Sequence, residues 1–176
     1  MTPSEEAAIT PVVRSVTVKA PVDHAFRRFT AEMATWWPLR SHSIGQADAE
    51  TVIMEGRVGG RILERIRGGS ESIWGTVTAW EPPRRVAFTW HPGQDPATAQ
   101  DVEVRFVAEG NETHVQLTHR GFERLGALGR KASRGYSLGW KHVLGFYAEH
   151  RGPFMVFMGA LTAVMMAVQR RPRKAA

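Results

Sequence analysis

The stretch from residue 51 to residue 120 alternates apolar and polar side chains with a period of two, and this pattern constrains the fold more than any other feature. Such alternation is typical of strands with one buried and one solvated face. Short links rich in glycine and proline separate the runs, which favours an antiparallel meander because parallel neighbours need long crossovers. The predicted strands cover residues 51–56, 60–67, 72–81, 84–91, 101–109 and 113–120.

Helices are predicted on both sides of these strands. A first strand over residues 12–19 leads into a short amphipathic helix over 22–31, where apolar side chains recur at helical spacing. Residues 33–48 predict a short helix broken at Pro38 and followed by loop. After the Gly-rich loop 121–133, a further helix is predicted over 134–150. This order of elements indicates an α+β fold.

The buried faces follow from the same periodicities. The last helix carries one apolar stripe of Tyr136, Trp140, Val143, Leu144 and Tyr147, with Ser137, Lys141 and His142 outside it. Alternation places Val86, Phe88, Trp90, Val102, Val104, Phe106, Val115 and Leu117 on the covered face of the sheet. Trp80 has the opposite parity from Val77, and we expect it to pack under Pro82-Pro83.

Composition excludes several classes of function. The 176 residues suit one domain, and none of them is a cysteine, which removes disulfides, thiolate zinc sites and cysteine nucleophiles and fits a reducing cytoplasm. The seven histidines are scattered without a compact ligand set, and the glycines form no phosphate loop. No metal or cofactor is therefore indicated. No secretory signal is readable at the N-terminus, so a cytoplasmic location is predicted.

The net charge of +6 is unevenly distributed. Residues 1–119 carry a net charge of −3, whereas residues 120–151 carry +5 and the basic residues within 170–174 carry +4. A nucleic-acid-binding domain would show basic residues over the whole binding face, so no nucleic-acid partner is predicted.

The C-terminal extension 151–176 needs its own explanation. Its segment 154–168 contains only one polar side chain, Thr162, and a helix of that length would span roughly 23 Å, short of a bilayer core of about 30 Å. Three alternatives stay open: packing on this domain or on a second copy, insertion into a membrane either shallowly or as a short tail anchor, or disorder. We predict one domain over residues 12–150, preceded by a tail of residues 1–11, that folds without the extension.

A set of short motifs points to a family. These are Trp36-Trp37-Pro38, His42-Ser43-Ile44-Gly45, Gly59-Gly60-Arg61, Trp74-Gly75-Thr76-Val77, Trp80-Glu81-Pro82-Pro83-Arg84-Arg85, Phe88-Thr89-Trp90, Val102-Glu103-Val104-Arg105-Phe106, Leu117-Thr118-His119-Arg120-Gly121-Phe122 and Gly139-Trp140. In their order and spacing, residues 12–150 resemble bacterial SRPBCC (START-like) proteins, in the branch named after activators of the heat-shock-protein-90 ATPase. The resemblance implies a helix-grip fold, in which a curved antiparallel sheet of about seven strands wraps round a long C-terminal helix with a ligand cavity between them.

Two ionisable residues fall on the covered face of the predicted sheet. Alternation places Glu64 between Ile62 and Ile66, and it places His119 two residues after Leu117. Charged groups facing an apolar interior are costly unless they are paired or hydrogen-bonded. They are candidates to bind the polar end of a ligand or to act as acid and base. The alternative is a satisfied core pair, or a position near the wet rim of the sheet.

Aromatic and apolar side chains supply the other candidates for a ligand cavity. These are Trp36, Trp37, Trp74, Trp90, Phe106, Trp140 and Leu144, which suit a flat hydrophobic ligand; the alternative is plain core packing. His42 follows a loop in a position to cover the cavity, with helix capping or a surface position as the alternative.

Three functions follow, in this order. The first is a protein that binds a small hydrophobic or amphipathic molecule, favoured because no catalytic set of residues is visible. The second is a cyclase-type or lyase-type enzyme that uses the same cavity. The third is a co-chaperone-like interaction protein, which the family name suggests. Segment 154–168 adds a membrane surface or a second copy of the chain as a partner.

Overall fold

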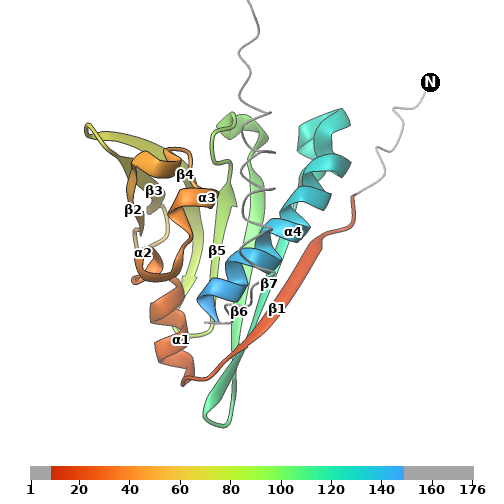
Figure 1. The fold of residues 1–176 in the computed structure, drawn as a ribbon. Coiled ribbons are helices and arrows are strands. Elements are labelled where there is room, and N and C mark those ends of the chain that lie inside the picture. Colours follow the sequence, from red (N-terminus) through yellow and green to blue (C-terminus); the bar gives the residue numbers. More distant parts are fainter. Residues whose placement is uncertain (1–8, 149–176) are drawn as a thin grey trace, which may run out of the picture.

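Seven strands form one antiparallel sheet in the order β1-β7-β6-β5-β4-β3-β2, in a computed structural model that describes residues 9–148 (Figure 1). From β2 to β7 each strand pairs with the next along the chain, as expected for a meander. β1 returns to pair with β7, with Val12 opposite His119. The strands are β1 Val12–Val18, β2 Ala49–Met54, β3 Arg61–Ile66, β4 Ser70–Glu81, β5 Arg85–Trp90, β6 Gln100–Glu109 and β7 Glu112–Arg120.

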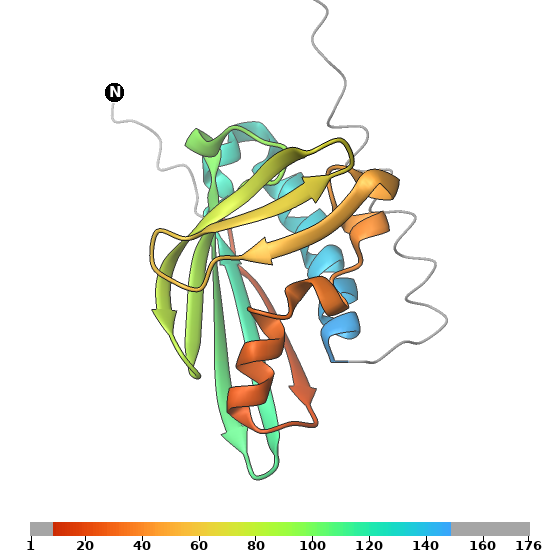
Figure 2. The same cartoon turned by 90° about the vertical axis from the view of Figure 1, so that its left-hand side faces the viewer.

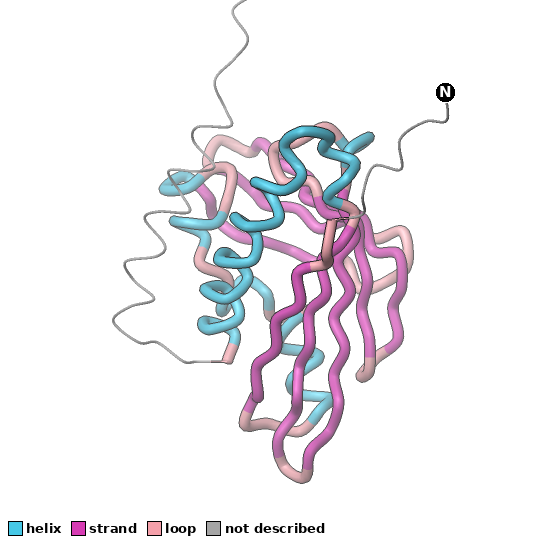
Figure 3. The backbone as a smooth tube through the Cα atoms, turned by 90° about the vertical axis from the view of Figure 1, so that its right-hand side faces the viewer, coloured by secondary structure: helices cyan, strands magenta, loops and turns pink. Residues whose placement is uncertain are grey.

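The helices lie on one side of this sheet, which curves around them (Figure 2). They are α1 Val22–Phe29, α2 Met33–Trp36, α3 Leu39–His42 and α4 Gly129–Tyr147, with short 3₁₀ helices at η1 Gln46–Asp48, η2 Pro96–Thr98 and η3 Phe122–Leu128. Figure 3 shows α4 as the longest helix, running along the near side of the sheet. The α+β helix-grip prediction is confirmed.

Helix α4 begins five residues earlier than the sequence pattern predicted. The Gly-rich loop expected over 121–133 contains η3 and the first turn of α4. The reason is close packing at the junction, because a Cβ on Gly129 would lie 2.3 Å from the carbonyl oxygen of Phe122. Gly129 therefore allows α4 to start directly against η3. The apolar residues of this stretch do not recur at helical spacing, so the sequence did not predict a helix there.

The predicted buried faces meet in the core. The residues of β5, β6 and β7 that alternation predicted to face inward are all at most 3% exposed. The stripe of α4 is buried as well: Trp140, Val143, Leu144 and Tyr147 are also at most 3% exposed. Tyr147 also donates from its hydroxyl to the carbonyl oxygen of Ala25, at 2.7 Å, which ties the end of α4 to α1.

A register shift in β4 places Trp80 differently from the prediction. The pairing of β4 with β5 is irregular between Val77 and Ala79, so Trp80 ends opposite the buried Val86. Its ring lies 5.2 Å from that of Phe26 in an edge-on contact. Trp80 therefore lies on the core side, because one irregular residue changes the face on which every later side chain of the strand lies, and its packing under Pro82-Pro83 stays a prediction.

The two terminal predictions fall almost entirely outside the described residues. Of the expected tail 1–11 only residues 9–11 are described, and the extension 151–176 lies beyond residue 148. Within residues 9–148, no helix combines the length and apolar character needed to cross a bilayer.

Candidate functional site

Five tryptophans form one continuous aromatic layer between α4 and the sheet. Trp37 contacts Trp74, Trp90 and Trp140, with ring centroids 5.2, 5.8 and 6.0 Å apart. Trp36 joins the group through Trp37 at 5.6 Å. All five are at most 7% exposed. The structure thus brings the predicted tryptophans together, and their contacts with one another are those of core packing; contact with a ligand stays a prediction.

Phe106 and Leu144 are buried but differ in their surroundings. Phe106 lies against α1, with its ring 5.2 Å from that of Phe26 and 5.7 Å from that of Phe29. Leu144 is 1% exposed on the core side of α4. The ring contacts of Phe106 are therefore with the aromatic residues of α1 rather than with the tryptophans.

Glu64 on β3 is a fully buried carboxylate whose hydrogen bonds come from the protein itself. Its Oε2 accepts from the backbone N–H of Ile44 and from Trp74 Nε1, each at 2.7 Å, and its Oε1 accepts from the backbone N–H of Gly45 at 2.6 Å. These donors compensate the cost of burying the charge. The carboxylate thereby fixes the loop after α3 to β3. This use of both oxygens favours an anchoring role over acid–base chemistry.

Replacing Glu64 with glutamine is expected to lower the free energy of unfolding by about 2–3 kcal/mol. The amide can keep the two bonds at one oxygen but turns its NH₂ group toward the third N–H donor. Urea unfolding measures the loss, with Glu71→Gln on β4 as control because that carboxylate is exposed and only ion-paired at the surface. Equal stability of the Glu64→Gln protein and the unmodified protein would contradict the anchoring role.

His119 on β7 is fully buried and bonded to α4. Its Nδ1 accepts a hydrogen bond from Trp140 Nε1 at 3.0 Å. A neutral imidazole with an accepting Nδ1 carries its proton on Nε2, so this bond fixes the tautomer. Burial lowers the pKa of His119 to about 3, which keeps the ring neutral near pH 7. Rings of Phe122 and Tyr136 lie at 4.4 and 4.6 Å.

The suggested pairing of Glu64 with His119 is not what the structure shows. Each residue is hydrogen-bonded to a different tryptophan, Glu64 to Trp74 and His119 to Trp140. Both residues are 0% exposed, so the alternative of a wet rim is also wrong. Glu64 is buried with satisfied partners, whereas His119 Nε2 has no hydrogen-bond partner within residues 9–148.

His42 is buried, contrary to the alternative of a surface position. Its ring stacks on that of His142 of α4, with centroids 5.0 Å apart and planes 21° from parallel. Burial, and to a lesser degree the nearby His142, lowers the pKa of His42 to about 4. Burial also lowers the pKa of His142. The sequence had placed His142 outside the apolar stripe; it is 3% exposed because α3 packs against that side of α4.

Five side chains that the sequence did not group lie together at the inner face; we call them the inner polar cluster: Trp90, Gln94, Gln100, His119 and Tyr136. Trp90 and Gln100 are direct partners in the β5–β6 register. Gln100 Nε2 donates to Gln94 Oε1 at 3.4 Å, and the ring of Tyr136 lies 4.6 Å from that of His119. The sequence could have identified Gln100 as an inner-face residue, because it lies two positions before Val102 in the alternation of β6.

Three buried atoms of the inner polar cluster have no hydrogen-bond partner among residues 9–148: Gln100 Oε1, His119 Nε2 and Trp90 Nε1. Gln100 is 0% exposed, and its amide nitrogen donates to the carbonyl oxygen of Thr98 at 2.6 Å. Burial also raises the pKa of Tyr136 to about 12, against the opposing effect of the neighbouring Trp90 and Gln94 side chains. Every titratable group of the cluster is therefore uncharged near pH 7.

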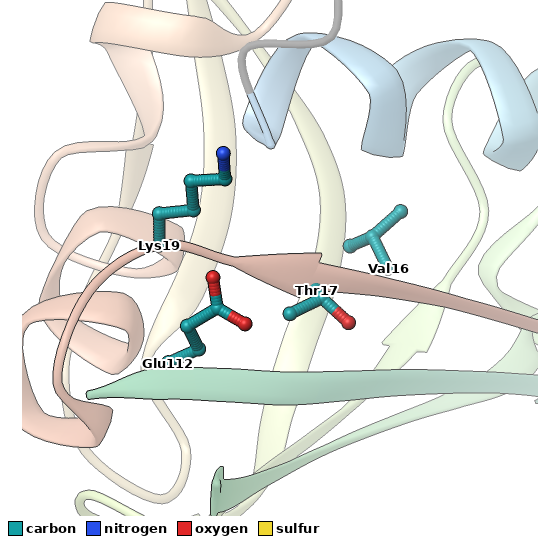
Figure 4. A pocket seen from close by; sticks show the side chains of 4 residues that line it. All are labelled: Val16, Thr17, Lys19 and Glu112. Atoms are coloured by element: carbon teal, nitrogen blue, oxygen red, sulfur yellow. The ribbon is translucent and has the colours of Figure 1, made fainter. Parts of the chain in front are cut away.

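A separate hollow of about 410 Å³ lies where β1 ends and β7 begins (Figure 4). It is lined by Val16, Thr17, Lys19 and Glu112, none of which the sequence singled out. Its lining carries charged groups, unlike the apolar cavity that was predicted. Across the described part of the chain, no group of three or more side chains is arranged to hold a metal ion.

Comparisons with known proteins give one consistent family. The family model described as Activator of Hsp90 ATPase homolog 1-like protein matches residues 19–146. The synthase Txn09, an anthrahydroquino-gamma-pyrone synthase, is 30% identical with a TM-score of 0.53, over 88% of this chain and 97% of that chain. The self-sacrificing resistance protein CalC from Micromonospora echinospora is 28% identical with a TM-score of 0.59, over 80% and 92%.

More distant similarity extends to a dimeric protein. The Aha1 dimer from Colwellia psychrerythraea is 16% identical with a TM-score of 0.53, over 82% of this chain and 100% of that chain, which shows the fold alone. The comparison with curated proteins gave no match.

Proposed function

This chain belongs to the Activator of Hsp90 ATPase homolog 1-like family, and on that premise we propose that it binds a small, largely apolar molecule between α4 and the inner face of the sheet. The fold supports a ligand-binding protein in general. The observation that carries the proposal for this chain is that three buried atoms of the inner polar cluster, Gln100 Oε1, His119 Nε2 and Trp90 Nε1, have no hydrogen-bond partner in the part of the chain that the structure describes.

Those three unpartnered atoms are costly to bury without a ligand. A buried polar group without a partner costs about 1–3 kcal/mol, and native proteins seldom keep such groups without a use. Here they lie at or beside the rings of Trp90 and Trp140, which are 5.4 Å apart. Aromatic surface with a few polar groups that converge on it is the usual composition of a small-molecule site.

A second candidate function is a cyclase-type or lyase-type enzyme that uses the same site. The observation that favours it is the 30% identity to the synthase Txn09. In that case the Nε2–H of His119 would hydrogen-bond a carbonyl oxygen of the substrate, and burial would keep the imidazole neutral. Conversion of a bound molecule into a product of different mass would favour the enzyme over the binding protein.

Native mass spectrometry of the full chain, purified from its own host, tests the proposed binding. We expect a retained molecule of a few hundred daltons that is released when the protein unfolds. We also expect an added neutral bicyclic compound at 100 times its Kd to stabilise the protein by about 2.7 kcal/mol. A ligand-free protein whose melting temperature is unchanged by naphthalene, coumarin and 2-quinolone would overturn the proposal.

A further inference from the structure

We infer that the inner polar cluster selects an uncharged planar ring that carries a carbonyl oxygen beside an N–H or O–H donor. This inference rests on the proposed function, because it names the class of ligand for the same site. The hydrogen-bonding roles of the buried atoms set which groups the ligand must present. The lack of charged side chains in the inner polar cluster sets its charge.

Two of the unpartnered atoms, His119 Nε2 and Gln100 Oε1, have opposite hydrogen-bonding character, and the third, Trp90 Nε1, is a second donor. His119 Nε2 must donate, since its Nδ1 already accepts from Trp140 Nε1 at 3.0 Å. Gln100 Oε1 can only accept, since the amide nitrogen of that residue donates to the carbonyl oxygen of Thr98. A ligand that satisfies both atoms therefore presents one acceptor and one donor.

The positions of the two residues favour an acceptor and a donor that are neighbours on the ligand. In the β6–β7 register His119 lies opposite Val102, and Gln100 is two residues before Val102 on the same face of β6. The two side chains are thus diagonal neighbours on the inner face of the sheet, within reach of a single ring.

The ligand class is uncharged because the cluster offers no counter-charge. Its members are a tryptophan, two glutamines, a tyrosine and a histidine that burial keeps neutral. An isolated carboxylate or ammonium group buried there would lose its hydration without gaining an ionic partner. The rings of Trp90 and Trp140 next to the cluster supply the apolar surface on which a flat ligand stacks.

A matched pair of probes tests the inference. Coumarin and 2-quinolone have the same shape, but the atom beside the carbonyl is an acceptor oxygen in coumarin and an N–H donor in 2-quinolone. By isothermal titration calorimetry with the full chain, we expect 2-quinolone to bind at least tenfold more tightly than coumarin. We expect 2-naphthoate, which is charged, to bind at least a hundredfold more weakly than 2-quinolone.

Variants identify the atom responsible. In Gln100→Leu the preference for 2-quinolone over coumarin should fall to within about twofold, because the acceptor is gone. Gln116→Leu, on the exposed face of β7, is the matched control and should keep the preference. The comparison of probes on the unmodified protein holds even if Gln100→Leu does not fold.

Three results would overturn the inference: equal binding of coumarin and 2-quinolone, a preference that survives Gln100→Leu, or tighter binding of 2-naphthoate. Binding of naphthalene alone would also overturn it while leaving the proposed function intact. Failure of every neutral probe, together with a ligand-free protein from the host, would instead count against the proposed function itself.

Discussion

Replacing Trp140 with alanine is expected to lower the free energy of unfolding by about 3–5 kcal/mol. The side chain is 3% exposed and contacts the rings of Trp37 and Trp90. Its removal leaves a cavity beneath α4 and takes away the donor to His119 Nδ1, so His119 loses its one protein partner. Urea unfolding of the full chain measures the loss.

Two further variants separate the contributions of Trp140. Trp140→Phe keeps much of the apolar contact but removes the indole N–H, so we expect a smaller loss of about 1–2 kcal/mol. Leu138→Ala, on the same helix but 44% exposed, is the control and should change stability by less than about 0.5 kcal/mol. A loss below about 1 kcal/mol for Trp140→Ala would contradict the core position of this ring.

Acidification from pH 6.5 to pH 4.5 is expected to destabilise the protein by about 4–5 kcal/mol through His42 and His119, and the lowered pKa of His142 adds to this loss. Burial lowers the folded-state pKa of His119 to about 3, and burial together with His142 lowers that of His42 to about 4, both below the unfolded value of 6.5. The unfolded chain therefore binds more protons in this window, and stability falls as pH falls.

Single substitutions test which histidines cause this pH dependence. His119→Gln should reduce the loss between pH 6.5 and 4.5 by about 2 kcal/mol, since one of the three buried imidazoles with a lowered pKa is gone. His24→Gln should leave the loss unchanged because that side chain is exposed in the folded protein. Urea unfolding at the two pH values decides, and an equal loss in His119→Gln and the unmodified protein would show that His119 is not the source.

Alternation along the chain was enough to predict the meander and the inward-facing side chains of β5, β6 and β7. Alternation is a local property, because successive side chains of a strand point to opposite faces. Val86, Val104 and Leu117 could therefore be assigned to the inner face one strand at a time. The order of the family motifs added the long covering helix, and the structure confirmed the helix-grip fold.

Which side chains become hydrogen-bond partners depends on how distant segments of the chain pack together. Alternation put Glu64 and His119 on the same face, but it does not specify which loop or helix lies above each of them. The loop after α3 reaches Glu64 with two backbone N–H groups, and α4 brings Trp140 to His119. Such contacts join segments far apart in the chain, so no local period encodes them.

Irregular pairing and helix packing decided the remaining positions. The shift between Val77 and Ala79 turned Trp80 toward the core, which a strict period of two cannot predict. α3 covered His142 on a side of α4 that looked polar, and the β5–β6 register set Gln100 beside Trp90. The face on which a side chain lies is set within one strand or helix. Its burial and its hydrogen-bond partners depend on the other segments that pack against that face. For this reason the candidate site could be identified only in the folded chain.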